Sequence, residues 1–276
     1  YEKEIKAEVH KTLLPTYDVF DENRYFEPAY EWNVIEFKGK RLAVTICEDI
    51  WNLGDNPLYR VCPMDLLMEQ KPDVMINLSA SPFDYTHFED RKAIIKANVL
   101  KYKLPMFYCN AVGSQTEIVF DGGSLIFDKE GNVRKIFPLF EEAVDGLKLN
   151  NDNTFSEPIV ESVSHVPTHE LNPEHLIPSL NIDEVYAALV MGIRDYFSKM
   201  GFTKAILGSS GGIDSAVTLV LACDALGAEN VRAVLMPSPY STSHSVDDAV
   251  QLSKNLGNPF DIIPIQPVYE SFLSSL

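Results

Sequence analysis

A glycine-rich loop between a predicted strand and a predicted helix is the segment that most restricts how this chain can fold. The loop spans residues 208–215 and has the sequence GSSGGIDS. An apolar run at residues 205–207 precedes it, a helical run covers residues 214–226, and residues 231–236 predict the next strand. This strand–helix–strand order predicts a parallel sheet whose ligand binds at the carboxyl ends of the strands.

The first half of the chain also alternates between predicted strands and helices. Polar residues and prolines replace this periodicity between residues 149 and 179, which is typical of a linker. We therefore expect an α/β protein with one domain in residues 1–148, a linker in residues 149–180 and a second domain in residues 181–276. Within the first domain we expect strands at residues 41–47, 73–78 and 106–112, helices at 63–69 and 88–102, and antiparallel strands at 117–120, 123–127 and 133–137.

Composition narrows the class of protein further. The 276 residues carry 23 basic and 40 acidic side chains, a formal net charge of −17. This charge argues against a nucleic-acid binder, because such proteins need clustered positive charge. The four cysteines form no Cys-x-x-Cys pair, which disfavours a zinc ribbon, and four cysteines in 276 residues do not make a disulfide scaffold. Since the sequence also contains no apolar signal core and no membrane-spanning apolar stretch, we expect a cytoplasmic protein without nucleic-acid or membrane partners.

The residue types in the glycine-rich loop fit a bound phosphate. Gly211 and Gly212 allow a tight turn that presents backbone N–H groups to an anion, and the following helix adds the positive end of its dipole. Ser210 and Ser215 can donate to phosphate oxygens, whereas Asp214 suits a phosphate site only with a cation such as Mg²⁺ between them. The loop lacks the Gly-Lys-Ser/Thr sequence of a Walker A loop. A plain glycine turn with a helix cap is the alternative.

A second candidate site centres on Cys47, at the end of the predicted strand 41–47. A thiol at a sharp turn can act as a nucleophile in acyl transfer, given a base and a cation for the developing negative charge. For a single cysteine, a role in the hydrophobic core is the common alternative. Two other segments favour catalysis: residues 10–17 (HKTLLPTY) place a lysine before an apolar pair and a proline, and residues 20–26 (FDENRYF) follow.

Together with residues 46–51 (ICEDIW), these segments resemble the nitrilase/amidase superfamily, and more closely the glutaminase domain of glutamine-dependent NAD synthetases. The resemblance implies a nitrilase-like α-β-β-α sandwich followed by a doubly wound parallel α/β nucleotide-binding domain. It also implies Cys47 as the nucleophile, Lys11 as the cation beside the tetrahedral intermediate, and Glu22 as a supporting glutamate. The general-base glutamate of the family lies upstream of the lysine, so we expect it to precede this chain.

The same resemblance implies residues that bind glutamine. Residues 77–83 (NLSASPF) leave a strand and correspond to a wall of the glutamine pocket, which assigns Ser81 to it together with Tyr17. His87 is assigned there too, although it stands where the family usually has a lysine. A helix N-cap is the alternative role for Ser81, but Thr86 is the better cap for the helix at residues 88–102.

The glycine-rich loop resembles the pyrophosphatase loop of ATP-dependent adenylating amidotransferases. Residues 192–197 (GIRDYF) and 236–242 (MPSPYST) narrow the likeness to NAD synthetases, with Pro239 where many relatives have arginine. The resemblance implies Arg194 as a contact to deamido-NAD and Asp214 as the ligand of Mg²⁺. The contacts to ATP that it implies are Gly208, Ser209, Ser210, Gly211, Gly212, Ile213, Asp214, Ser215 and Met236.

The resemblance therefore implies glutamine-dependent synthesis of NAD, with L-glutamine, deamido-NAD and ATP as small-molecule substrates, Mg²⁺ as cofactor, and a homo-oligomer. We expect the chain to be part of a longer protein, cut at both ends, with little activity and poor solubility by itself. Two alternatives remain. One is a nitrilase-type amidase whose second domain binds a nucleotide as a regulator, and the other is a non-catalytic fragment.

Overall fold

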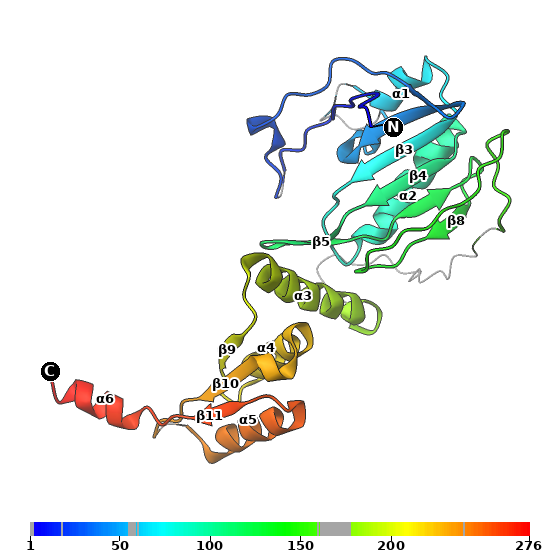
Figure 1. The fold of residues 1–276 in the computed structure, drawn as a ribbon. Helices are drawn as coiled ribbons and strands as arrows, with labels where there is room; N and C mark the ends of the chain where they lie inside the picture. Colours follow the sequence, from blue (N-terminus) through cyan, green and yellow to red (C-terminus); the bar gives the residue numbers. More distant parts are fainter. Residues whose placement is uncertain are drawn as a thin grey trace. The chain divides into compact units, whose positions relative to one another are not determined.

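The computed structural model describes residues 3–17, 19–54, 59, 61–158, 160, 178–239 and 241–276, and the chain divides into two compact units (Figure 1). The first unit comprises Tyr1–Gly113 and Phe120–Leu176, and the second comprises Ser114–Val119 and Ile177–Leu276. Most of the predicted linker, residues 161–177, and Tyr240 lie outside the described residues. Residues 149–158 pack on the first unit, where Lys40 donates to the carbonyls of Asn150 and Asn151.

A six-stranded sheet forms the centre of the first unit, in the order β1-β2-β3-β4-β7-β8. Strands β2, β3 and β4 run parallel, and β1, β7 and β8 are antiparallel to their neighbours. Parallel neighbours need crossover connections, which α1 and α2 supply. The bounds are β1 Ile35–Phe37, β2 Lys40–Ile46, β3 Val74–Ser79, β4 Met106–Asn110, β7 Leu125–Phe127, β8 Val133–Ile136, α1 Pro63–Met68 and α2 His87–Tyr102.

The hydrophobic core of the first unit lies between one face of this sheet and the two helices. Every second residue of each strand points to this face, so Ala43, Met75 and Met106 are at most 1% exposed. Ile95 and Val99 of α2, one turn apart, pack against them. This packing fixes the register of β2–β4 and brings their carboxyl ends to one edge of the sheet.

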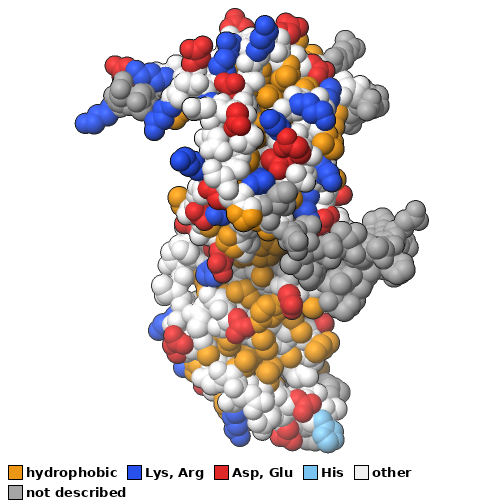
Figure 2. All heavy atoms as spheres, turned by 90° about the vertical axis from the view of Figure 1, so that its right-hand side faces the viewer, with side chains coloured by type: hydrophobic (Ala, Val, Ile, Leu, Met, Phe, Trp, Pro, Cys, Tyr) orange, Lys and Arg blue, Asp and Glu red, His pale blue; other side chains and the backbone are white. Residues whose placement is uncertain are grey.

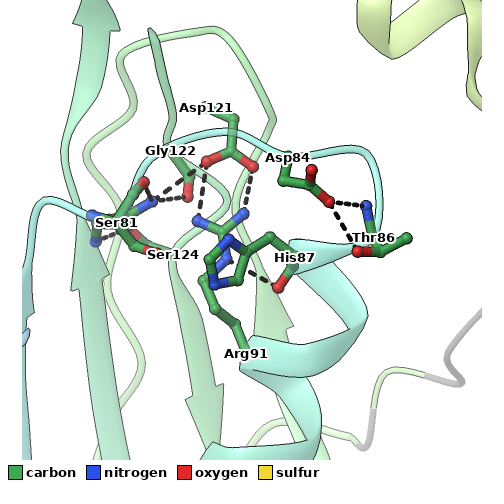
Figure 3. Close-up of polar contacts among 9 residues, drawn as sticks. Ser81, Asp84, Thr86, His87, Arg91, Asp121, Gly122 and Ser124 are labelled. Atoms are coloured by element: carbon green, nitrogen blue, oxygen red, sulfur yellow. Dashed lines mark hydrogen bonds and ion pairs between the residues drawn. The ribbon is translucent and has the colours of Figure 1, made fainter. Parts of the chain in front are cut away.

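A buried ion pair ties α2 to β6 (Ile118–Asp121), as Figure 3 shows. Arg91 is fully buried, and its guanidinium donates to both carboxylate oxygens of Asp121. Its Nε also donates to the carbonyl of His87, 3.3 Å away. A buried charge that loses its partner is costly, so this pair makes the start of α2 depend on β6.

We expect Arg91→Met to lower the free energy of unfolding by about 3–5 kcal/mol, because Asp121 would remain buried without a counter-charge. The matched control is Lys92→Met on the same helix. Lys92 pairs with Glu89 near the surface, so its loss should cost at most about 1 kcal/mol. Urea denaturation followed by circular dichroism measures both, and equal losses would contradict the role of the buried pair.

The second unit is built around a three-stranded parallel sheet in the order β11-β10-β9. Its core contains Leu219 of α4, Val231 and Leu235 of β10, and Ala249 of α5, each at most 2% exposed. The bounds are α3 Pro178–Met200, β9 Ala205–Gly208, α4 Ile213–Leu226, β10 Val231–Leu235, α5 Ser243–Leu256, β11 Phe260–Ile262 and α6 Gln266–Leu273.

The tip of a hairpin from the first half of the sequence belongs to this second unit. The hairpin consists of β5 (Val112–Gln115) and β6. The N–H of Ser114 donates to the carboxylate of Asp195 on α3 at 2.7 Å, and Lys199, one turn later, donates to the carbonyl of Ser114.

Apolar side chains gather on one face of the second unit, in the lower part of Figure 2. The exposed apolar residues of this unit include Tyr186 and Leu189 of α3, Ile206 of β9 and Val217 of α4. A contiguous apolar surface of this kind is typical of an interaction site. Within the described residues, no helix is long and apolar enough to cross a bilayer.

The predicted fold class is confirmed. In the first unit, the described residues contain one half of the predicted sandwich: the six-stranded sheet with α1 and α2 on one face. The second unit contains a parallel sheet with helices packed against it, as predicted. Four strands and α-helices were not predicted: β1, β5, α5 and β11. The predicted strand 106–112 ends at Asn110, and Val112 opens β5.

Candidate active site

The carboxyl ends of β2, β3 and β4 border a cavity of about 620 Å³ in the first unit. A cavity at this edge of a parallel sheet is a usual place for a small ligand. The strand ends contribute Ile46, Cys47, Leu78, Ser79, Ala80, Cys109, Asn110 and Ala111 to its lining. The segment before β1 contributes Val9, His10, Lys11, Leu14, Phe20, Glu22, Phe26 and Glu27.

Cys47 directly follows β2 and turns the chain sharply. Its φ is +46°, in the left-handed region that non-glycine residues rarely occupy. A short 3-10 helix, Cys47–Ile50, begins at this turn. Strained backbone of this kind costs about 1–3 kcal/mol and recurs at functional sites. The turn makes the residue part of the cavity wall instead of the sheet core.

Lys11 and Glu22 form an ion pair in the same cavity. The ammonium of Lys11 lies 2.6 and 2.7 Å from the two carboxylate oxygens of Glu22. The side chains are only 14% and 23% exposed, so water screens this pair less than a surface pair. The structure thus brings together Cys47, Lys11 and Glu22, the three residues that the sequence assigned to catalysis.

The surroundings of the Cys47 thiol contain groups that raise its pKa and groups that lower it. Burial raises the pKa of Cys47 most strongly, and the Glu48 carboxylate raises it further. The positive charge of Lys11 lowers this pKa, as do hydrogen bonds from the Ala80 backbone and the Ser79 hydroxyl. Lys11 therefore favours the thiolate, the form that attacks a carbonyl.

We expect Lys11→Met to shift the pH profile of Cys47 alkylation upward, because the largest influence that lowers the pKa of the thiol would be lost. Iodoacetamide labelling across pH, followed by mass spectrometry of the peptide that carries Cys47, measures this shift. Lys101→Met is the control, since Lys101 belongs to the same unit and pairs with Asp65. An unchanged profile for Lys11→Met would mean that the ammonium does not act on the thiol.

Tyr17 contacts the residue next to the cysteine. Its hydroxyl donates to the carboxylate of Glu48 at 2.9 Å, and Tyr59 donates to the other oxygen at the same distance. The Glu48 carboxylate, itself 6% exposed, helps to raise the pKa of Tyr59, after burial as the larger cause. Tyr17 is thereby held beside the cysteine turn, although it is not among the residues that line the cavity.

Ser81 and His87 lie beside the Arg91–Asp121 pair (Figure 3). Ser81 is 5% exposed, and its N–H donates to the side-chain oxygen of Asn110 at 2.9 Å. His87 opens α2, and its ring meets Trp51 edge-on at 5.7 Å. Neither residue lines the 620 Å³ cavity, so their roles in binding glutamine stay predictions.

Thr86 occupies the N-cap position of α2, as predicted, but its hydroxyl makes no capping bond to the helix. It donates instead to the carboxylate of Asp84 at 2.7 Å (Figure 3).

Sequence reasoning missed two buried polar residues that hold this site together. Asp49 accepts N–H groups on both sides of the cavity, from the Lys11 segment and from the end of β2. The side-chain oxygen of Asn110 accepts the backbone N–H of Ser81, and its side-chain NH₂ group donates to the carbonyl of Gly122. The only signal in the sequence was a polar residue beside a strand end, and that signal does not identify partners tens of residues away.

The glycine-rich loop of the second unit borders a smaller cavity of about 220 Å³. The loop follows β9 and precedes α4, at the carboxyl edge of the parallel sheet. The hydroxyls of Ser210 and Ser215 lie 3.1 Å apart and accept N–H groups of the loop itself. The two hydroxyls therefore hold the N–H groups of Ser210 and Gly212 in place near the cavity. A phosphate oxygen could replace the hydroxyls as the acceptor of these N–H groups.

The other residues assigned to nucleotide binding are distributed around this loop. Gly208, Ser209 and Met236 line the cavity together with Ser210. Ile213 and Asp214 open α4, next to the loop. Arg194 lies on α3, half-exposed, with its guanidinium 3.8 Å from Asp195, and it does not line this cavity.

A single carboxylate beside a phosphate loop fits Mg²⁺, which in nucleotide sites commonly takes one or two protein carboxylates plus substrate phosphates. Asp214 supplies one, in the first turn of α4. Across the part of the chain that the structure describes, no group of three or more His, Cys, Asp or Glu residues could hold a metal by itself. A cation here would therefore need the phosphates of the nucleotide as further ligands.

Gly211 is the one position in the loop where both conformation and space demand glycine. Its φ is +82°, and a Cβ built there would lie 2.1 Å from the backbone oxygen of Ser245, in the first turn of α5. The loop and α5 can meet only because this side chain is missing. Gly212 differs, because its φ is −85° and a Cβ would meet only the Ser210 hydroxyl at 3.4 Å.

We expect Gly211→Ala to lower the free energy of unfolding by about 3 kcal/mol, through left-handed strain and the contact with α5. Gly212→Ala is the matched control and should cost less than about 1 kcal/mol. Calorimetric titration with ATP should show weaker binding for Gly211→Ala only. Equal effects of the two substitutions would contradict the close approach of α5 to the loop.

Fold and sites together define an α/β protein with two units: one has a cavity lined by a cysteine, a lysine and a glutamate, and the other has a glycine-rich loop at the carboxyl edge of a parallel sheet. Residues 185–276 match the family model described as NAD synthase. The glutamine-dependent NAD(+) synthetase of Synechocystis sp. is 40% identical over 278 residues, which cover 99% of this chain and 47% of that protein. The corresponding synthetase of Thermotoga maritima is 39% identical over 291 residues, 99% of this chain and 50% of its own length.

A solved structure of a glutamine-dependent NAD+ synthetase is also similar to this chain. The glutamine-dependent NAD+ synthetase from Acinetobacter baumannii, in complex with ADP, superposes with a TM-score of 0.84 at 34% identity, covering 99% of this chain and 48% of that one. The resemblance inferred from the sequence motifs is therefore confirmed along nearly the whole chain. The chain spans about half the length of the curated relatives it matches.

Proposed function

We propose that this chain carries the amide-cleaving cysteine and the ATP loop of a glutamine-dependent NAD synthetase. The observation that carries the proposal is the presence of both sites on one chain: the cavity with Cys47, Lys11 and Glu22, and the loop at residues 208–215. Relatives named glutamine-dependent NAD(+) synthetase, matched over 99% of the chain, support it. The proposed domains are residues 1–148 and 181–276.

In the first half-reaction, Cys47 attacks the side-chain carboxamide carbon of glutamine. A carbon–sulfur bond forms, the carbon–nitrogen bond breaks, and the proton of the thiol ends on the departing ammonia. Lys11 is the charge beside the tetrahedral oxyanion, and Glu22 holds its ammonium in place at 2.6 Å. Water then hydrolyses the thioester to glutamate. We assign Tyr17, Ser81 and His87 to glutamine binding.

In the second half-reaction, the nicotinate carboxylate of deamido-NAD attacks the α-phosphorus of ATP and pyrophosphate leaves. Ammonia then attacks the activated acyl carbon, and AMP leaves. The N–H groups of Ser210 and Gly212, with the N-terminus of α4, bind phosphate oxygens. Asp214 would hold Mg²⁺, which neutralises phosphate charge when bound. Arg194 is assigned to deamido-NAD.

The setting of the reaction is also part of the proposal. We assign the protein to the cytoplasm, and the apolar face of the second unit supports a homo-oligomer. The acidic net charge of −17 supports small molecules instead of nucleic acid as partners.

Two substitutions in the full-length protein test the proposal. Cys47→Ala should abolish NAD formation from glutamine but leave formation from ammonia, because the thiol serves only amide cleavage. Asp214→Asn should abolish both, together with deamido-NAD-dependent exchange of pyrophosphate into ATP, while glutamine hydrolysis persists. Steady-state assays with each nitrogen donor measure these activities.

The chain offers matched controls for both substitutions. Cys109→Ala removes a second thiol at the same cavity, and Asp224→Asn removes a carboxylate farther along α4. Each control should retain both activities. Loss of ammonia-driven synthesis in Cys47→Ala would contradict the assignment of two separate sites. Glutamine hydrolysis without any pyrophosphate exchange would favour an amidase with a regulatory nucleotide domain.

A further inference from the structure

The buried carboxylate of Asp49 connects the backbones of the two segments that carry Lys11 and Cys47. Asp49 is 2% exposed. One of its oxygens accepts the N–H groups of Thr12 and Leu13 at 2.9 and 2.8 Å. The other accepts the N–H of Ile46 at 3.0 Å.

The donors flank the two residues of the candidate glutaminase site. Thr12 and Leu13 directly follow Lys11, and Ile46 directly precedes Cys47. The two segments are more than thirty positions apart in the sequence, and the Lys11 segment belongs to no strand of the sheet. Strand pairing therefore does not hold the Lys11 segment against the end of β2, and the hydrogen bonds of Asp49 do.

The other bonds of Lys11 and Thr12 lead to residues away from the cysteine turn. The carbonyl of Lys11 accepts the N–H of Ala29 at 2.8 Å, and the hydroxyl of Thr12 accepts from Trp32. The Lys11 ammonium is bound to Glu22. These contacts tie residues 11 and 12 to residues 22–32. The Tyr17 hydroxyl, six residues after Lys11, also reaches the cysteine turn through Glu48. Asp49 is the contact that holds the backbone directly after Lys11 against this turn.

We propose that Asp49 is a positioning residue that sets the placement of the Lys11 ammonium relative to the Cys47 thiol. The proposal rests on the proposed glutaminase function of this cavity. Asp49 itself touches neither substrate nor the reacting atoms; it acts through the backbone of the two segments that carry them.

Asparagine cannot replace this carboxylate, although it has nearly the same size. Its amide has one acceptor oxygen and one NH₂ group, whereas three N–H donors on two sides point at Asp49. Either orientation of the amide would set a donor against a donor, so one segment must move away. A displacement of about 1 Å at a catalytic group can cost 10²-fold in rate.

The experiment compares Asp49→Asn with Asp128→Asn in the full-length protein. Asp128 is the matched control because it is also a buried aspartate of the first unit that accepts backbone N–H groups. It is 6% exposed and accepts the N–H groups of Glu130 and Asn132 in the turn between β7 and β8. It does not line the cavity. Asp128→Asn therefore reproduces the loss of a buried acceptor without touching either catalytic segment.

Two readouts separate positioning from stability. The pH profile of Cys47 alkylation by iodoacetamide should shift upward by about one pH unit in Asp49→Asn, because Lys11 lies farther from the thiol. The kcat for glutamine hydrolysis should fall about 100-fold with a smaller change in KM, while ammonia-driven synthesis is retained. Asp128→Asn should lose comparable stability to urea but change neither readout.

A conservative variant covers the case in which Asp49→Asn does not fold. Asp49→Glu keeps both acceptor oxygens, so it should fold and restore part of the alkylation profile. An Asp49→Asn profile that coincides with the wild type, with kcat unchanged, would overturn the proposal. Where only Asp49→Glu folds, a profile shifted upward by the full pH unit would overturn it, because both acceptor oxygens are still present. So would an equal shift in Asp128→Asn. If the wild type hydrolyses no glutamine, the proposed function fails, and the alkylation profile still tests the placement of Lys11.

Discussion

Parallel pairing of β2, β3 and β4 is the constraint on which the first candidate site depends. Because the three strands run in the same direction and in register, their carboxyl ends meet at one edge. The cavity lies there, and Cys47 reaches it through a left-handed turn immediately after β2. The sheet supplies only one side of the site, however. The lysine comes from a segment without regular structure, which hydrogen bonds to buried side chains hold against the sheet edge.

The second unit uses the same principle with a different chemistry. Its loop also lies at the carboxyl edge of parallel strands, but it presents backbone N–H groups instead of a nucleophile. The close approach of α5 to Gly211 gives the loop its shape. In both units a turn after a strand forms the candidate site. The turn has a strained left-handed residue at Cys47 in the first unit, whereas in the second unit the left-handed position is occupied by Gly211, which adopts it without strain.

Much of the fold could be predicted from local pattern. Apart from β1 and β11, the strands of the six-stranded and three-stranded sheets follow apolar patterns, as do helices α1, α2 and α4, and their bounds agree with the prediction within a few residues. The short strands β1 and β11 have too few residues to show a period, and α5 is mostly polar outside one narrow face. The grouping of Cys47, Lys11 and Glu22 was predicted from family motifs. Asp49 and Asn110 were not, because their partners are fixed by tertiary contacts.

The proposed function requires that the thiol of Cys47 form a covalent bond to the glutamyl group of glutamine during turnover. The most direct test is to quench the full-length protein with acid while it turns over glutamine, and to analyse the peptide that carries Cys47 by mass spectrometry. We expect an added glutamyl group on Cys47 that disappears when glutamine is exhausted. Steady release of ammonia from glutamine with no glutamyl adduct on Cys47, or with the adduct on another residue, would contradict it.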